Sequence, residues 1–193
     1  MEEKFAYIEG AEQPISMHPK KFALWLFIVS VVMIFASLTS AYIVRQAEGN
    51  WLDFELPVIF WYTSAIIVIS SFPLHYAYLA AKKDEFQKLK VGMMLTAILG
   101  LAFLVGQWYS WVALVDRDVY FVGNPAGSFL YVFTGLHAIH LISGVIFLII
   151  VLISSFRYKV HSKNMNAMEM CVTYWHFLGG LWLYLFMFLL LNH

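Results

Sequence analysis

The sequence predicts an all-α, polytopic membrane protein: a bundle of five transmembrane helices, with the N-terminus in the cytoplasm and the C-terminus outside. Of its 193 residues, 62% are hydrophobic and only 12% are charged, which lies far outside the composition of soluble proteins. Every Asp, Glu, Lys and Arg falls outside five long uncharged runs, and a spanning helix needs about 20 apolar residues. These runs are Phe22–Val44, Leu56–Ala81, Val91–Val115, Val119–Phe156 and Met170–His193.

Each run predicts one membrane crossing. The fourth run, at 38 residues, is too long for one helix and too short for two helices with a turn. Asn124-Pro125 supplies a helix start, because proline is tolerated at the first helical position. A polar cytoplasmic tail, residues 1–19, precedes a single membrane domain, residues 20–193. The predicted spans are about 22–44, 57–81, 91–115, 126–155 and 169–191.

The orientation follows from the basic residues of the connecting segments. Ten of the twelve Lys and Arg residues lie in the N-terminal tail, the second-to-third connection or the fourth-to-fifth connection. Basic residues concentrate on the cytoplasmic side of membrane proteins. The two exceptions, Arg45 and Arg117, lie in the predicted outer loops.

Composition also excludes several classes of protein. The single cysteine, Cys171, rules out an intramolecular disulfide framework and any multi-cysteine zinc or iron–sulfur site. The formal net charge is zero, so no basic surface indicates a nucleic-acid partner.

The first three helices carry features typical of helix packing. Ser30, Ser37 and Ala41 recur on one face of the first helix, where small side chains allow close approach of a neighbour. Pro73 is expected to kink the second helix. Gln107, in the third, is expected to form an interhelical hydrogen bond.

The last two helices carry most of the candidate functional residues. Polar groups at membrane depth are costly unless partnered, so they are functional or packing-critical by default. We expect His137, His140 and Gly144 to share one face of the fourth helix. The fifth helix has a second polar face, on which four residues recur at helical spacing: Glu169, Thr173, His176 and Gly180.

Three interpretations compete for these histidines. His140 and His176 could ligate a haem, as in b-type membrane cytochromes, although only this one pair is nearly matched in depth. Independent proton transport needs buried carboxylates, and no span contains one away from its boundary. The third interpretation is structural, because a neutral histidine can donate and accept across a helix interface. It predicts a subunit of a larger complex, with no catalytic residue, no cofactor-binding residue and no metal ligand of its own.

Several motifs resemble one known family. They are TGLHAIHLISG in the fourth helix, and Glu169 followed by YWHF and WLYLF in the fifth. The run Phe22–Val44 is similar to a membrane helix of the same family, which it matches at Trp25, Leu26 and Phe27. Together they resemble subunit III of the haem–copper respiratory oxidases, in its five-helix form.

The resemblance implies an accessory subunit of a proton-pumping cytochrome c oxidase in aerobic respiration. In that family the haems and copper belong to partner subunits, chiefly subunit I, and subunit III binds no redox cofactor. The resemblance further implies packing on subunit I, contact with subunit II or other respiratory-complex subunits, bound phospholipid, and support of proton uptake and durability. It implies a bacterial cytoplasmic membrane as the location. Quinol-oxidase and nitric-oxide-reductase-associated members of the family remain alternatives.

The resemblance also suggests structural, lipid-facing or helix-interface roles for particular residues. His137, His140 and Gly144 match the family's histidine helix, and Arg157 matches a basic residue near a lipid headgroup. The signature of the last helix is matched by Glu169, His176 and Trp182.

Three positions depart from the family pattern. Where relatives carry an acidic residue, this chain has Val31, Ser110 and Gly179. We therefore expect this subunit not to react with a hydrophobic carbodiimide inside a span, and a labelled peptide from the first helix would refute this.

Overall fold

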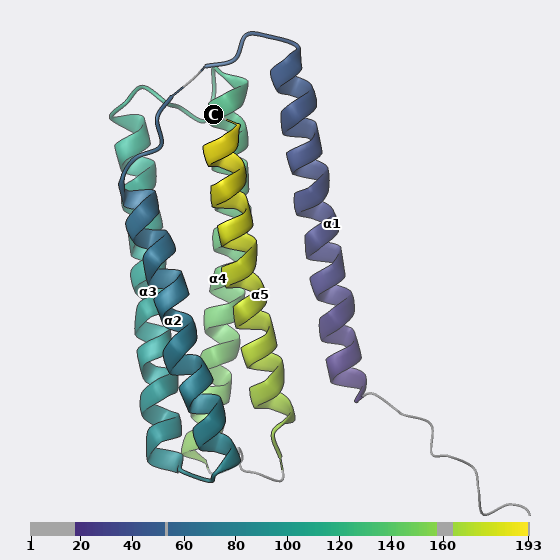
Figure 1. Cartoon of the computed structure of the whole chain (residues 1–193), viewed down its shortest axis with the longest axis vertical. Coiled ribbons are helices and arrows are strands. Elements are labelled where there is room, and N and C mark those ends of the chain that lie inside the picture. Colours follow the sequence, from purple (N-terminus) through teal and green to yellow (C-terminus); the bar gives the residue numbers. More distant parts are fainter. Residues whose placement is uncertain (1–17, 53, 158–163, 193) are drawn as a thin grey trace, which may run out of the picture.

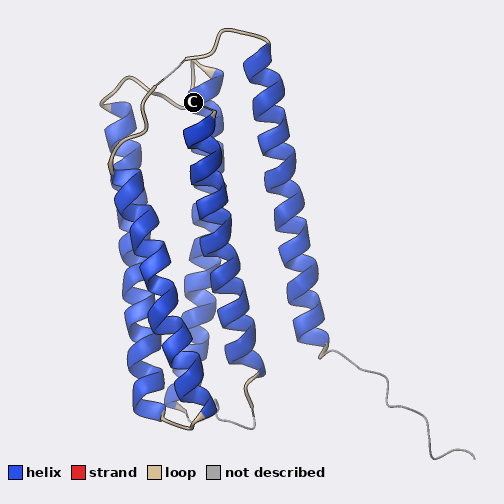
Figure 2. Cartoon of the chain, viewed as in Figure 1, coloured by secondary structure: helices blue, strands red, loops and turns tan. Residues whose placement is uncertain are grey.

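The computed structural model describes residues 18–52, 54–157 and 164–192. Five α-helices account for nearly all of them (Figures 1 and 2), and no β-strand occurs among these residues. All five helices are long and apolar enough to cross a membrane. The predicted all-α, five-helix membrane fold is confirmed, and the chain is an integral membrane protein. The helices are α1 (Pro19–Ala47), α2 (Ile59–Lys82), α3 (Phe86–Val115), α4 (Pro125–Phe156) and α5 (Asn166–Leu191).

The α1, α3 and α5 helices begin before their apolar runs, whereas α2 and α4 begin inside theirs. The α3 helix begins at Phe86, about a turn before the predicted position, because Gln, Lys and Leu are good helix formers. The ammonium of Lys88 lies 2.8 Å from Glu85, and this hydrogen bond lowers the pKa of the Glu85 carboxyl. The α4 helix starts at Pro125, as expected, and the Asn124 side chain accepts a hydrogen bond from the Ala126 amide at 2.9 Å.

Four helices form the packed core, and α1 stands apart from them. The α1 helix contacts only α4 and α5 (Figure 1). The α2–α3 pair is close-packed at Gly92, where an added Cβ would lie 2.7 Å from the Pro73 carbonyl oxygen. The α2 helix is continuous through Pro73, and the kink expected there stays a prediction.

The described basic residues gather at one end of the bundle. The start of α1, the α2–α3 turn, the end of α4 and the start of α5 lie at this lower end in Figure 1. Arg45 and Arg117 lie near the opposite end. The cytoplasmic side of this basic end stays a prediction, and Lys4, Lys159, Lys163 and residues 1–17 of the predicted tail lie outside the described residues. The basic end carries Lys20, Lys21, Lys82, Lys83, Lys88, Lys90 and Arg157.

Candidate functional site

His137 lies on α4 and is fully buried against α3 and α5. Its Nε2 lies 3.2 Å from the carbonyl oxygen of Leu178 on α5. A carbonyl can only accept, so Nε2 carries the proton and donates. The imidazole also packs against Trp182 and Phe103, with ring centroids 4.9 Å and 5.7 Å away. His137 therefore joins three helices by one hydrogen bond and two ring contacts.

Two tryptophans on α5 connect it to α2. The indole N–H of Trp175 donates to Ser70 Oγ at 3.0 Å, and that of Trp182 donates to Ser64 Oγ at 2.9 Å. Both indoles are buried. The seven-residue spacing of the tryptophans and the six-residue spacing of the serines fit two antiparallel helices. That pairing of spacings is the sequence signal for these partners, which sequence reasoning missed.

His140 faces a different helix from His137, so the expected common face is wrong. Its ring packs against Phe35 and Phe27 of α1, at centroid distances of 5.8 Å and 6.2 Å. Its Nδ1 lies 2.7 Å from the Leu136 carbonyl oxygen of its own helix. Three residues along a helix rotate a side chain by about 60°, which is enough to move it to another neighbour.

Gly144 lies with His137 on the face toward α5. A Cβ at Gly144 would stand 2.6 Å from Leu178 Cδ1, so the Leu178 side chain would have to shift to admit a side chain there. Leu178 thus meets both residues: its carbonyl accepts from His137 and its side chain packs on Gly144.

Three cavities lie along one side of α5, two of them against α1 and one against α2. At the basic end, Glu169 forms an ion pair with Lys21 of α1, and each side chain is about one-third exposed. Next to it, a cavity of about 480 Å³ is lined by His75, Tyr78, Glu169, Val172, Thr173 and His176. We call this surface the α5 groove; its floor is Glu169, Thr173, His176, Phe177 and Gly180.

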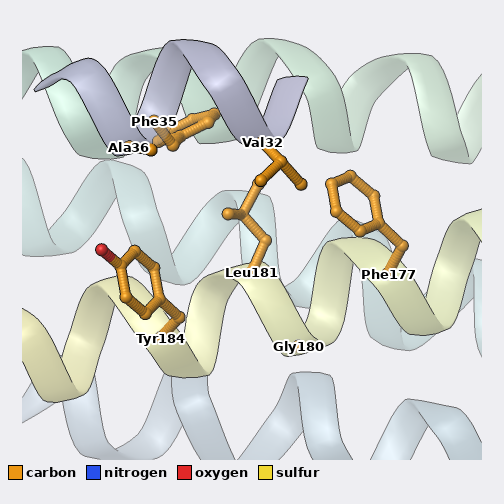
Figure 3. Close-up of a pocket in the computed structure, with 7 residues that line it drawn as sticks. All are labelled: Val32, Phe35, Ala36, Phe177, Gly180, Leu181 and Tyr184. Carbon is orange, nitrogen blue, oxygen red and sulfur yellow. The ribbon is translucent and has the colours of Figure 1, made fainter. Parts of the chain in front are cut away.

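Farther along the α5 groove, the lining becomes apolar (Figure 3). A cavity of about 420 Å³ lies between α1 and α5. An added Cβ at Gly180 would meet no atom within 4 Å, so this part of the groove is open. The hydroxyl groups of Tyr184 and Thr39 are hydrogen-bonded at 3.1 Å. The cavity is lined by Val32, Phe35, Ala36, Phe177, Gly180, Leu181 and Tyr184.

The arrangement disfavours haem ligation by His140 and His176. His140 packs on α1, whereas His176 shares its cavities with His75 of α2. The two rings therefore do not face one another. Within the described ranges, no group of three or more His, Cys, Asp or Glu side chains is placed to hold a metal ion.

The remaining predicted residues occupy separate positions. Arg157 is the exposed C-cap of α4 at the basic end, and its proposed headgroup role stays a prediction. The three departures from the family pattern, Val31, Ser110 and Gly179, are all buried. An acidic residue at any of them would have to be protonated or partnered.

Gln107 contradicts its prediction. Its side chain is 1% exposed, yet neither its amide nitrogen nor its carbonyl oxygen has a hydrogen-bond partner among the described residues. The expected interhelical bond to another side chain is not formed.

Comparison with known proteins gives consistent matches over most of the chain. A family model described as cytochrome c oxidase subunit III matches residues 50–192. A probable cytochrome c oxidase subunit 3 from Nocardia farcinica is 32% identical over 173 residues, covering 84% of this chain and 82% of the relative. The cytochrome c oxidase subunit 3 of Thermostichus vulcanus is 28% identical, covering 88% and 86%. A probable quinol oxidase subunit 3 from Staphylococcus saprophyticus is 24% identical, covering 86% and 85%.

Proposed function

The chain belongs to the cytochrome c oxidase subunit III family, and from this membership we propose that it is the accessory third subunit of a proton-pumping haem–copper terminal oxidase. In this proposal it packs on subunit I in a bacterial cytoplasmic membrane, near subunit II. The haems and copper reside in those partner subunits. This chain supports proton uptake and the durability of the enzyme during turnover.

The observation that supports an accessory role is that buried polar groups form hydrogen bonds between helices. The N–H groups of His137, Trp175 and Trp182 are each donated to a neighbouring helix. These three hydrogen bonds hold α5 against α2 and α4, so they support a packing role for the groups that donate them. Their arrangement supports a rigid scaffold inside the membrane.

The test compares the oxidase purified with and without this chain. We expect the complex lacking it to reduce oxygen at a similar initial rate per haem, then to lose activity sooner during turnover. Proton uptake should also slow. A subunit I–II pair as durable as the whole enzyme would contradict the accessory role.

Between the two electron donors found among relatives, we propose cytochrome c. The relatives from Nocardia and Thermostichus are named as cytochrome c oxidase subunits, whereas the Staphylococcus relative is named as a quinol oxidase subunit. Turnover of the purified complex with reduced cytochrome c, and a dinuclear copper signal from subunit II, would support this assignment. Turnover with quinol alone would replace it with the quinol-oxidase alternative.

We also propose that the α5 groove holds a phospholipid. Its basic end offers Lys21, Glu169 and His75 to a polar headgroup, and its apolar portion suits acyl chains. Charged residues at one end of α5 and an apolar cavity farther along the same helix match the amphipathic shape of a lipid, because Lys and Arg near helix ends reach the headgroup level.

Filling the apolar cavity tests this lipid site. Gly180→Phe places a ring in the open space of Figure 3, so the purified oxidase should retain about one fewer phospholipid per complex by native mass spectrometry. Gly135→Phe is the matched control, because Gly135 is also a helical glycine facing open space but does not line the groove. Equal lipid retention in both variants would refute the site.

A further inference from the structure

Two buried side chains in the middle of the bundle carry polar atoms that have no hydrogen-bond partner among the described residues. They are Gln107 on α3, through both Nε2 and Oε1, and His137 on α4, through Nδ1. Gln107 is 1% exposed and His137 is 0% exposed. Buried polar atoms are nearly always hydrogen-bonded, so three such atoms in one region point to a ligand.

The helix geometry brings these two residues to the same interface. Phe103 of α3 contacts His137. Two turns farther along α3, the indole of Trp111 donates to Thr134 of α4 at 2.9 Å. Gln107 lies one turn from each α3 residue, on the same face. It therefore faces the stretch of α4 that contains His137 and Thr134.

The unpartnered atoms comprise two acceptors and one donor. His137 Nε2 donates to Leu178, so Nδ1 is an acceptor that needs a donor. Gln107 Oε1 also needs a donor, whereas Gln107 Nε2 can supply one. A direct bond from Gln107 Nε2 to His137 Nδ1 would leave Oε1 without any donor.

The neighbouring donors are already used. Ser110 Oγ donates to the Gly106 carbonyl at 2.9 Å, and Thr134 Oγ1 donates to the Leu130 carbonyl at 2.8 Å. The Trp111 indole is committed to Thr134. A molecule that can donate twice and accept at least once would satisfy all three atoms, and water has this valence.

We propose that Gln107 and His137 form a binding site for one buried water molecule, which bridges α3 and α4 beside α5. The water donates to His137 Nδ1 and Gln107 Oε1 and accepts from Gln107 Nε2. The site belongs to the packing of this subunit and stands independently of its proposed role in the oxidase.

The assembled oxidase provides a direct test. A structure at a resolution that shows ordered water should contain one water within hydrogen-bond distance of Gln107 and His137. Density showing the two side chains in direct contact, or no ordered water between them, would overturn the proposal.

A substitution tests the same site through the sign of its effect. Gln107→Met keeps a similar shape and removes both polar atoms. If the water is present, the variant breaks its bonds and the thermal midpoint of the complex falls by about 2–4 °C. If the atoms of Gln107 are truly unpartnered, their removal leaves the midpoint unchanged or raises it, and the proposal fails.

Ser155→Ala is the matched control. Ser155 Oγ is buried and has no hydrogen-bond partner among the described residues, and it lies at the basic end of α4, away from Gln107. Its removal should not lower the midpoint. A fall equal to that of Gln107→Met would assign the effect to the loss of any buried polar atom, and would overturn the bridging role.

Discussion

Trp182 combines a large buried surface with one specific hydrogen bond. Its indole is 1% exposed, packs against His137 and Phe103, and donates to Ser64 Oγ. In an apolar interior the N–H cannot exchange this bond for one to water, so the bond fixes how far α5 slides along α2.

Trp182→Phe should lower the stability of the subunit by about 1–3 kcal/mol, because it removes the donor and part of the packed ring. The measurement is the thermal unfolding midpoint of the purified complex. Trp25→Phe is the control, since Trp25 is 51% exposed and should change the midpoint little. In the Ser64→Ala background the Trp182 substitution should cost less; equal cost would show that the hydrogen bond contributes nothing.

Val31 predicts a chemical difference from acidic relatives. The side chain is 1% exposed, and α1 contains no acidic residue from Pro19 to Ala47. A hydrophobic carbodiimide should therefore leave α1 unlabelled, whereas Val31→Glu should create a buried, protonated carboxyl that reacts. Mass spectrometry of peptides from both proteins checks this. Label on wild-type α1, or none on the variant, would contradict the prediction.

The α2 and α3 helices approach most closely where a glycine removes the side chain. Gly92→Ala should destabilise the protein by about 1–3 kcal/mol, since its Cβ would meet the backbone carbonyl of Pro73 and neither helix can move easily. Gly180→Ala, which faces open space, should be neutral or stabilising by about 0.5–1 kcal/mol. Thermal midpoints compare the two variants. Similar effects at both positions would rule out the close approach.

Sequence reasoning was most successful for the helices themselves. Long uncharged runs specify membrane spans because lipid offers no partner for an open backbone, and the Asn124-Pro125 cap placed α4 correctly. Neighbour relations were harder. Hydropathy does not say which helix lies beside which. The helices that His137 and His140 contact therefore emerged only from packing, and so did the choice of α2 as the partner of Trp175 and Trp182.

For the whole molecule, the distinguishing feature is how α1 is attached. Ion-pair and hydrogen-bond contacts along the length of α1 join it to α5 and to Asn192, the residue just after α5. They are the Lys21–Glu169 ion pair, the Thr39–Tyr184 hydrogen bond, and bonds from Tyr42 and Gln46 to the Asn192 carbonyl at 2.7 Å and 3.1 Å. Along α1, the cavity of Figure 3 lies between the Lys21–Glu169 ion pair and the Thr39–Tyr184 hydrogen bond. Because α1 contacts only α4 and α5, these bonds contribute a large share of its attachment to the bundle.

Breaking the ion pair tests that attachment. Lys21→Gln should weaken the docking of α1 by no more than about 1 kcal/mol, because both side chains are partly exposed and the pair is screened. The charge-swapped pair, Lys21→Glu with Glu169→Lys, should recover most of the loss. Cysteine cross-linking between α1 and α5 measures the docking. A swapped pair as weak as the single variant would mean that the two charges do not interact.

The attachment of α1 also fixes an order of events during synthesis. The α1 helix is made before the other four helices, yet its contacts are with α4 and α5. Its hydrogen bonds join residues about 150 positions apart, such as Tyr42 and Asn192. At about 5–20 residues per second, α1 waits roughly ten seconds or more in the bilayer before those partners emerge from the ribosome. The α2–α3 hairpin, joined by a short turn, can close while α1 is still waiting. The α1 helix is therefore made before the α2–α3 hairpin but docks after it, and the α5 groove forms only once α5 itself has been made.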